Sequence, residues 1–85
     1  MPFYTYILQS ESTGQIYIGQ TNDLDRRLLE HNDPDFKGTY HTKRRIGPWS
    51  IIYFEEYSSR SEAMCREKEL KSGKGRRWIK QYVLK

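Results

Sequence analysis

A cationic and a titratable side chain share the apolar face of a short helix that the sequence predicts after Asn22. Over residues 24–31, two leucines alternate with Arg27 and His31 at helical spacing, so all four side chains lie on one face. In an ordinary helix packed on a sheet, a guanidinium and an imidazole point outward. Charged groups on a face that must be buried often mark a functional site. Arg27 and His31 are therefore candidates for chemistry.

A carboxylate has a similar position in a later helix. Glu67 falls between Ala63 and Met64 on the apolar face of the helix expected after Ser59. A buried carboxylate needs a cation or hydrogen-bond donors, because unpaired burial of a charge is costly. Lys71, one turn further on, could supply the cation as an i,i+4 ion pair. A divalent metal is the alternative, because hard cations prefer carboxylate oxygen.

Two tyrosines stand in neighbouring predicted strands. Residues 3–9 are rich in aromatic and β-branched side chains, and residues 15–20 follow after a turn at Gly14, so the two segments predict an antiparallel hairpin. If Tyr6 lies opposite Tyr17, both phenols project from one face of the sheet. A slip of one residue would place them on opposite faces. Packing with the hydroxyl groups at the rim of the core is the alternative interpretation.

Basic residues gather in two stretches. Residues 32–48 form a long irregular segment, whose hydroxyls, imidazole and cations suit phosphate contacts. Residues 66–85 hold eight basic and two acidic residues, net +6; residues 1–65 hold seven and nine, net −2, which gives the formal +4. A basic end of this kind suggests a polyanionic partner, nucleic acid before membrane. A solvated helix surface and a basic loop without a fixed partner are the alternatives.

The length of the chain predicts one small domain over residues 1–85. Such a chain buries roughly 60–65% of its unfolded surface, so we expect a thin, single core. The single Cys65 cannot form an internal disulfide, which fits a reducing cytoplasm. No secretory signal and no apolar run of membrane-spanning length is visible, so we expect a cytoplasmic protein.

The pattern of segments predicts an α+β fold in the order β-β-α-β-α-α. Asn22 is the expected N-cap of the first helix. Residues 49–57 predict the third strand, and the capping box at 59–62 begins the second helix. The glycines of residues 72–75 are expected to end that helix, and residues 76–84 to form the last one. The result is a three-stranded antiparallel sheet flanked by three helices.

Taken together, these pieces resemble the GIY-YIG nuclease domain, close to the small stand-alone bacterial members. Tyr17-Ile18-Gly19 matches the second half of the family's motif, and Tyr4-Thr5-Tyr6 ends in the tyrosine of the first half. Tyr4 and Thr5 replace the family's glycine and isoleucine, which could reshape the approach of the substrate. The resemblance covers nearly the whole chain and rests on the ordered set Tyr6, Tyr17, Gly19, Arg27, His31 and Glu67.

The resemblance implies metal-dependent hydrolysis of phosphodiester bonds in nucleic acid, DNA before RNA, of the repair or recombination type. Glu67 would hold one Mg²⁺ or Mn²⁺, and Arg27 would donate to the scissile phosphate. Tyr6 would accept a proton from the attacking water, Tyr17 would orient water or phosphate, and His31 would share the proton transfer or bind phosphate. Gly19 belongs to the motif as a structural residue. Nucleic-acid contacts are expected from His41, Lys43, Arg44, Arg45, Lys71, Arg76 and Arg77.

Two alternatives remain beside this expectation. The first is a nucleic-acid-binding module of the same fold that does not cleave, and whose affinity falls steeply with salt. The second is a small interaction domain in which the tyrosines and the Glu67–Lys71 pair are structural. A separate protein partner could direct the domain to its substrate.

Overall fold

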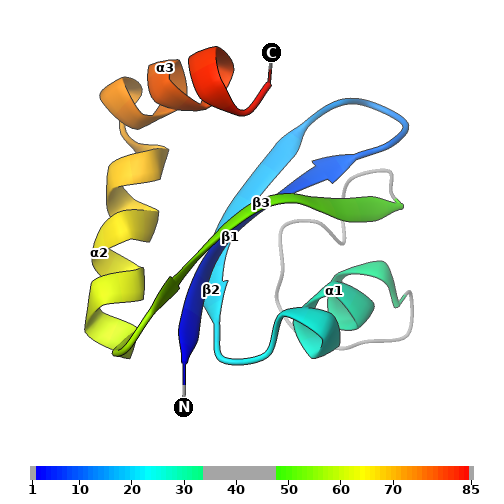
Figure 1. Cartoon of the computed structure of the whole chain (residues 1–85). Helices are drawn as coiled ribbons and strands as arrows, with labels where there is room; N and C mark the ends of the chain where they lie inside the picture. The colour runs from blue at the N-terminus through cyan, green and yellow to red at the C-terminus, as the bar shows by residue number, and fades with distance from the viewer. Residues whose placement is uncertain (1, 34–47, 85) are drawn as a thin grey trace.

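The computed structural model describes residues 2–33 and 48–84. Its elements follow the predicted order β-β-α-β-α-α and confirm the α+β class (Figure 1). They are β1 (Phe3–Ser10), β2 (Ile16–Thr21), α1 (Leu24–Asn32), β3 (Trp49–Tyr57), α2 (Arg60–Lys71) and α3 (Gly73–Tyr82). Within these residues no helix has the length and apolar character needed to cross a membrane.

The three strands form one antiparallel sheet in the order β2-β1-β3, so β1 lies in the centre. Tyr6 lies opposite Gly19, and Leu8 lies opposite Tyr17. The expected pairing of Tyr6 with Tyr17 is therefore wrong by two residues, because the turn closes with Ser10 N–H donating to the Gln15 carbonyl. Since side chains alternate with a period of two, the two tyrosines still project from the same face.

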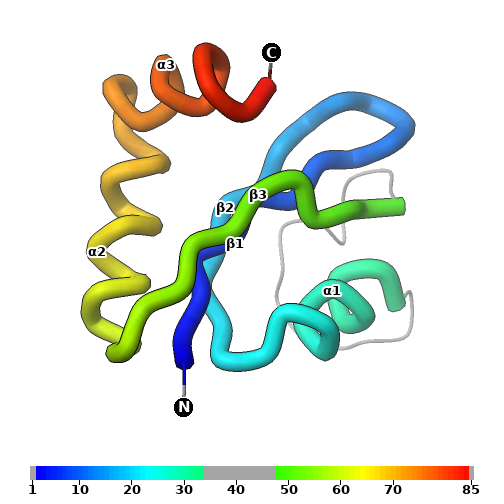
Figure 2. The backbone as a smooth tube through the Cα atoms, viewed as in Figure 1, coloured from blue at the N-terminus to red at the C-terminus, as the bar shows by residue number. Residues whose placement is uncertain are grey.

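Helices cover both faces of the sheet. α1 packs on one face, and α2 with α3 packs on the other (Figures 1 and 2). The α1 side is built from Tyr6, Leu8, Trp49, Ile51, Leu24 and Leu28. The opposite side is built from Ile7, Ile18, Leu70 and Ile79. Because both faces of β1 are covered, its residues 5–8 are all buried.

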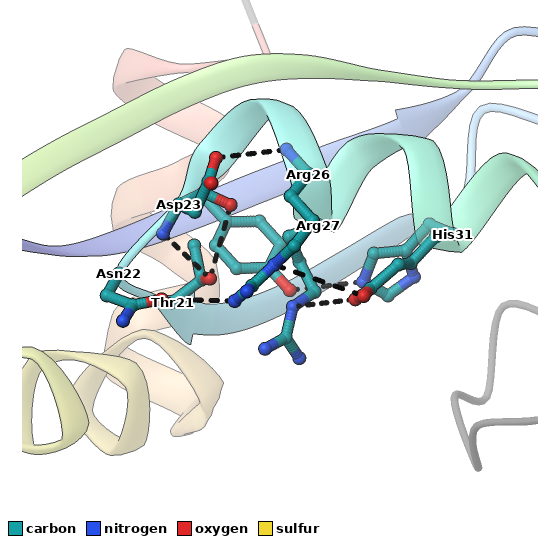
Figure 3. Close-up of polar contacts among 8 residues, drawn as sticks. Thr21, Asn22, Asp23, Arg26, Arg27 and His31 are labelled. Atoms are coloured by element: carbon teal, nitrogen blue, oxygen red, sulfur yellow. Dashed lines mark hydrogen bonds and ion pairs between the residues drawn. The ribbon is translucent and has the colours of Figure 1, made fainter.

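The first helix begins one residue later than expected. Asp23 is its N-cap, and the Asp23 carboxylate accepts a hydrogen bond from the Arg26 amide at 3.1 Å (Figure 3). Thr21 Oγ1 in turn accepts from the Asp23 amide at 3.1 Å. The side chain of Asn22 instead accepts from the guanidinium of Arg26. Asn22 and Asp23 are both good capping residues, and the position of Thr21 favours the second of them.

Ser72 separates the last two helices, so the expectation of glycine caps at this junction is wrong. Ser72 is both the C-cap of α2 and the N-cap of α3, where its hydroxyl accepts from the Gly75 amide at 3.1 Å. α3 therefore begins three residues earlier than expected. Gly75 has a different role: a Cβ there would lie 2.0 Å from the Glu69 carbonyl oxygen. Only glycine allows the chain to turn this sharply from α2 into α3 (Figure 2).

α2 begins at the expected capping box and is tied to the sheet by polar contacts. The hydroxyl of Ser59 accepts from the Glu62 amide. Thr5 Oγ1 donates to the Ala63 carbonyl at 2.7 Å, and Arg66 binds Glu55 of β3 with Nε at 2.9 Å. The sheet-facing apolar positions are Ala63 and Leu70, with Glu67 between them; Met64, which was expected on this face, is exposed.

Candidate active site

Four of the candidate residues come together on the α1 face of the sheet. Tyr6 of β1 and His31 of α1 are 2% and 3% exposed, and their Oη and Nε2 atoms lie 3.1 Å apart. The ring of Tyr17, from β2, lies with its centroid 4.8 Å from that of His31 and 6.4 Å from that of Tyr6. Arg27 lies one helical turn before His31 and projects from the same side of α1 (Figure 3).

Gly19 gives this cluster its shape. It lies opposite Tyr6 across the sheet, and a Cβ at this position would stand 2.6 Å from Tyr6 Oη and 2.8 Å from Tyr6 Cζ. The same Cβ would stand 3.1 Å from the Tyr17 ring. A glycine is required because the phenol of Tyr6 lies directly over the β2 backbone, which any other residue would obstruct.

Arg27 brings a partly exposed cation to the edge of the cluster. Its Nε lies 3.4 Å from Glu30 Oε1 in an i,i+3 ion pair, and its side chain is about one-quarter exposed. The pKa of the Tyr17 phenol is raised, chiefly by burial, and the charge of Arg27 opposes a small part of this rise. The guanidinium is thus placed where it can meet an anion beside Tyr17.

Tyr17 also links the cluster to α2, which packs on the other face of the sheet. Burial raises the pKa of Tyr17 above its usual value; the charge of Lys71 opposes this shift, and Glu67 adds to it. Lys71 and Glu67 act on Tyr17 because β2 is an outer strand, whose edge is accessible from α1 and from α2. The two helices therefore bring charges of both signs to the same phenol.

Glu67 makes the ion pair that its spacing predicts. Its Oε2 lies 2.6 Å from Lys71 Nζ, and the two side chains are 23% and 49% exposed. Among residues 2–33 and 48–84, no three His, Cys, Asp or Glu side chains gather in a way that could hold a metal ion. Within the described residues, a metal at this place would take Glu67 as a ligand, with water or substrate phosphate beside it. Mg²⁺ commonly binds in such open, water-rich sites.

The residues expected to contact nucleic acid divide into three groups. His41, Lys43, Arg44 and Arg45 lie outside the described residues. Lys71 and Arg76 line a groove of about 760 Å³ between β2 and α3, together with Lys80. Arg77 is exposed but does not line this groove. Lys80 is not among the predicted contacts, although its i,i+4 spacing from Arg76 places both on one face of the helix.

The chain is similar to known proteins along most of its length. The family model described as the GIY-YIG catalytic domain matches residues 2–82. A UPF0213 protein of Haloquadratum walsbyi is 39% identical over 69 residues, covering 81% of this chain and 73% of that protein. A UPF0213 protein of Streptococcus agalactiae is 40% identical over 67 residues, covering 79% and 72%. The solution NMR structure of a UPF0213 protein from Bacillus halodurans has a TM-score of 0.54 at 34% identity, covering 98% and 87%.

Proposed function

The chain belongs to the GIY-YIG catalytic domain family, a nuclease superfamily, and from this premise we propose that it is a metal-dependent endonuclease that hydrolyses phosphodiester bonds in DNA. The observation that carries the proposal is the convergence of two phenols, an imidazole and a guanidinium from β1, β2 and α1. The proposal treats residues 1–85 as one catalytic domain, cytoplasmic and of the repair or recombination type, which a protein partner could direct to its substrate.

In this proposal Arg27 binds the scissile phosphate. A guanidinium presents its donors in a planar fork that matches two phosphate oxygens. Its partial burial strengthens the interaction, because the surrounding protein screens charge less than water does. Charge that develops on the phosphate during attack therefore meets a fixed cation, which is the usual source of a large part of catalysis.

Tyr6 and His31 carry the proton. A phenol with its usual pKa of about 10 is a poor base at neutral pH. The hydrogen bond between Tyr6 Oη and Nε2 of His31 offers a solution: in the tautomer whose Nε2 carries no proton, the phenol can give its own proton to the neutral imidazole. His31 is then an imidazolium, and the Tyr6 phenolate accepts a proton from the attacking water. The hydroxide attacks phosphorus, the P–O bond to the leaving oxygen breaks, and the proton held by His31 balances the charge of that oxygen. Tyr17, whose raised pKa keeps it protonated, donates a hydrogen bond that orients the phosphate or the water.

Glu67 is the residue that would hold one Mg²⁺ or Mn²⁺, and such an ion supplies neutralisation of charge at the phosphate and at the leaving oxygen. A metal at Glu67 would compete with the ammonium group of Lys71, which lies 2.6 Å from Oε2, and could release it. The released Lys71 can then contact the anionic substrate.

One observation favours a second candidate function. The Glu67–Lys71 pair already satisfies the carboxylate without a metal. The same fold could therefore bind nucleic acid without cleaving it, with Arg27 as a phosphate contact and Glu67 as a structural residue. In that case binding would not depend on divalent ions and would weaken steeply with salt.

A cleavage assay tests the two candidates. Wild type, Arg27→Ala and Glu67→Ala are compared on single-stranded, duplex, nicked and branched DNA and on RNA, with Mg²⁺, Mn²⁺ or EDTA. We expect metal-dependent products from wild type and a loss of about 10²–10³ in kcat for each variant. Arg26→Ala is the matched control, because Arg26 is an exposed neighbour on α1, and it should cleave as wild type does.

Three outcomes decide between the candidates. Equal cleavage by wild type and both variants would refute the proposed site. Salt-sensitive binding in EDTA, together with no cleavage of any substrate in either metal, would favour the binding module. Lower stability of Glu67→Gln, with unchanged metal and nucleic-acid binding, would make Glu67 a purely structural residue.

A further inference from the structure

A groove runs along the outer edge of β2, beside the candidate active site. We propose that this groove binds the nucleic-acid strand on one side of the bond to be cut, with Lys71, Arg76 and Lys80 as its phosphate contacts. The inference rests on the proposed function for the nature of the ligand. The residues, charge and position of the groove are features of the fold alone.

The groove is formed by two distant parts of the chain. One wall is the stretch from Gly14 to Ile18, at the beginning of β2, and the other comes from the end of α2 and from α3. Its volume of about 760 Å³ is in the range of clefts that take small organic ligands. It is thus large enough for part of a nucleic-acid strand.

The charge of the groove selects an anion. Among the residues that the structure describes, three cationic side chains line it, and none of the lining residues is acidic. Arg76 and Lys80 follow each other by one helical turn, about 6 Å along α3. Successive phosphates of one strand can match such a separation. Phosphate neutralisation by Lys and Arg is the main source of nucleic-acid affinity.

The apolar lining indicates more than a phosphate site. Ile16, Ile79 and Leu84 also line the groove. A free inorganic anion gains nothing from contact with aliphatic side chains. A polynucleotide presents sugars and base faces beside each phosphate, so it can use both kinds of surface.

The groove continues into the candidate active site through Tyr17. Tyr17 lines the groove, and its ring also packs 4.8 Å from the ring of His31. Lys71 lines the groove as well and binds Glu67. One end of a nucleic-acid strand in the groove would therefore reach the cluster of Tyr6, Tyr17 and Arg27. The groove would hold the phosphates next to the scissile one, on one side only.

A binding experiment in EDTA tests the groove without hydrolysis. The fluorescence anisotropy of a short fluorescein-labelled DNA, single-stranded or duplex, is titrated with wild type, Arg76→Glu and Lys80→Glu. We expect the dissociation constant to rise about tenfold for each variant. The slope of log affinity against log salt should fall by about 0.7–0.9 for each phosphate that the variant no longer neutralises. Lys74→Glu is the matched control, since Lys74 is exposed on α3 and the substitution changes the net charge equally from outside the groove.

The position of the ligand is tested by phosphate scanning. Single neutral methylphosphonate linkages are moved along the DNA, and binding is measured again. Neutral linkages on one side of a central position should weaken binding to the wild-type protein. The same linkages should weaken binding to Lys80→Gln by less. Equal weakening by Lys74→Glu and Arg76→Glu, or unchanged binding in both groove variants, would overturn the inference. Groove-dependent binding without cleavage in any metal would instead refute the proposed hydrolysis and leave the groove in place.

Discussion

The phenol oxygen of Tyr6 lies 3.1 Å from Nε2 of His31, 25 residues further along the chain. Tyr6 belongs to the central strand and His31 to the last turn of α1. Both side chains are almost completely buried, so bulk water cannot replace either partner of the hydrogen bond. Each group therefore fixes the orientation of the other, and the contact ties α1 to the sheet at the centre of the candidate site.

Tyr6→Phe should lower both activity and stability. The phenylalanine keeps the ring but removes the hydroxyl that exchanges protons, so we expect kcat for DNA cleavage to fall by about 10²–10⁴. Loss of the buried hydrogen bond should lower the free energy of unfolding by about 0.5–1.5 kcal/mol. Steady-state cleavage and urea unfolding measure the two effects. Tyr82→Phe, at an exposed position of α3, should change neither. Cleavage at the wild-type rate by Tyr6→Phe would contradict the proton path.

Gly19→Ala should strain the same contact from the other strand. Its Cβ would approach Tyr6 Oη to 2.6 Å, so either the ring or the strand must move. Overpacking of this kind costs about 1–3 kcal/mol. In a double-mutant cycle with Tyr6→Phe, the losses should be less than additive, because the closest atom is then absent.

Gly73→Ala is the control for this prediction, because nothing lies within 4 Å of its Cβ position and its backbone is helical. Urea unfolding should find it neutral or slightly stabilised. A neutral Gly19→Ala, or strictly additive losses in the cycle, would show that Tyr6 does not depend on the glycine.

The local pattern of the sequence predicts the type and order of the elements well. The strand at 49–57 and the capping box at Ser59 are both confirmed. The register of the hairpin was missed by two residues, because the hydrogen bonds of the Ser10–Gln15 turn set it, and the apolar pattern reads the same after any even shift. The role of Ser72 as the cap shared by two helices was also missed. The two glycines that follow it are good caps by residue type, and only the close approach of Gly75 to the Glu69 carbonyl at the end of α2 shows what a glycine does there.

The candidate site was predictable where its residues break the apolar pattern. Arg27 and His31 stand at positions where leucine would be ordinary, and Glu67 stands between two buried residues of α2. The groove could not be predicted in the same way. Lys80 is an ordinary surface lysine in the sequence, and only the position of α3 beside β2 gives it a shared surface with Tyr17.

Thr5→Val should separate stability from function. Thr5 is buried, and its hydroxyl donates to the Ala63 carbonyl of α2 at 2.7 Å, which explains a polar residue in the central strand. Valine has nearly the same shape and lacks the donor, so we expect a loss of about 1–2 kcal/mol in the free energy of unfolding. Cleavage per folded molecule should stay unchanged, since Thr5 does not touch the candidate site.

The control for Thr5 is Thr13→Val in the exposed turn, which should change stability by no more than about 0.5 kcal/mol. Urea unfolding and cleavage at a temperature well below the midpoint measure the two quantities. A Thr5→Val protein with the free energy of unfolding of wild type would mean that the hydrogen bond to Ala63 does not hold α2 on the sheet. A stable but inactive one would place Thr5 in the catalytic machinery.

The raised pKa of Tyr57 should make the stability of the protein fall at alkaline pH. Burial and its hydrogen bond to Glu55 raise its pKa from 10.0 to about 12. Below about pH 10 the phenol is protonated in both the folded and the unfolded chain, so its stabilising effect is complete. Between about pH 10 and 12 the unfolded chain releases this proton while the folded chain retains it, so stability falls as pH rises.

Tyr57→Phe tests this dependence directly. The variant removes one donor to Glu55, which also binds Arg66, so it should be less stable than wild type at neutral pH. Its further decline between about pH 10 and 12 should be shallower, because one group with a raised pKa is gone. Some decline should remain, since the pKa values of Tyr17 and Tyr53 are raised as well. Urea midpoints at a series of pH values measure the slopes. An equally steep decline in Tyr57→Phe would show that the proton is not held by Tyr57.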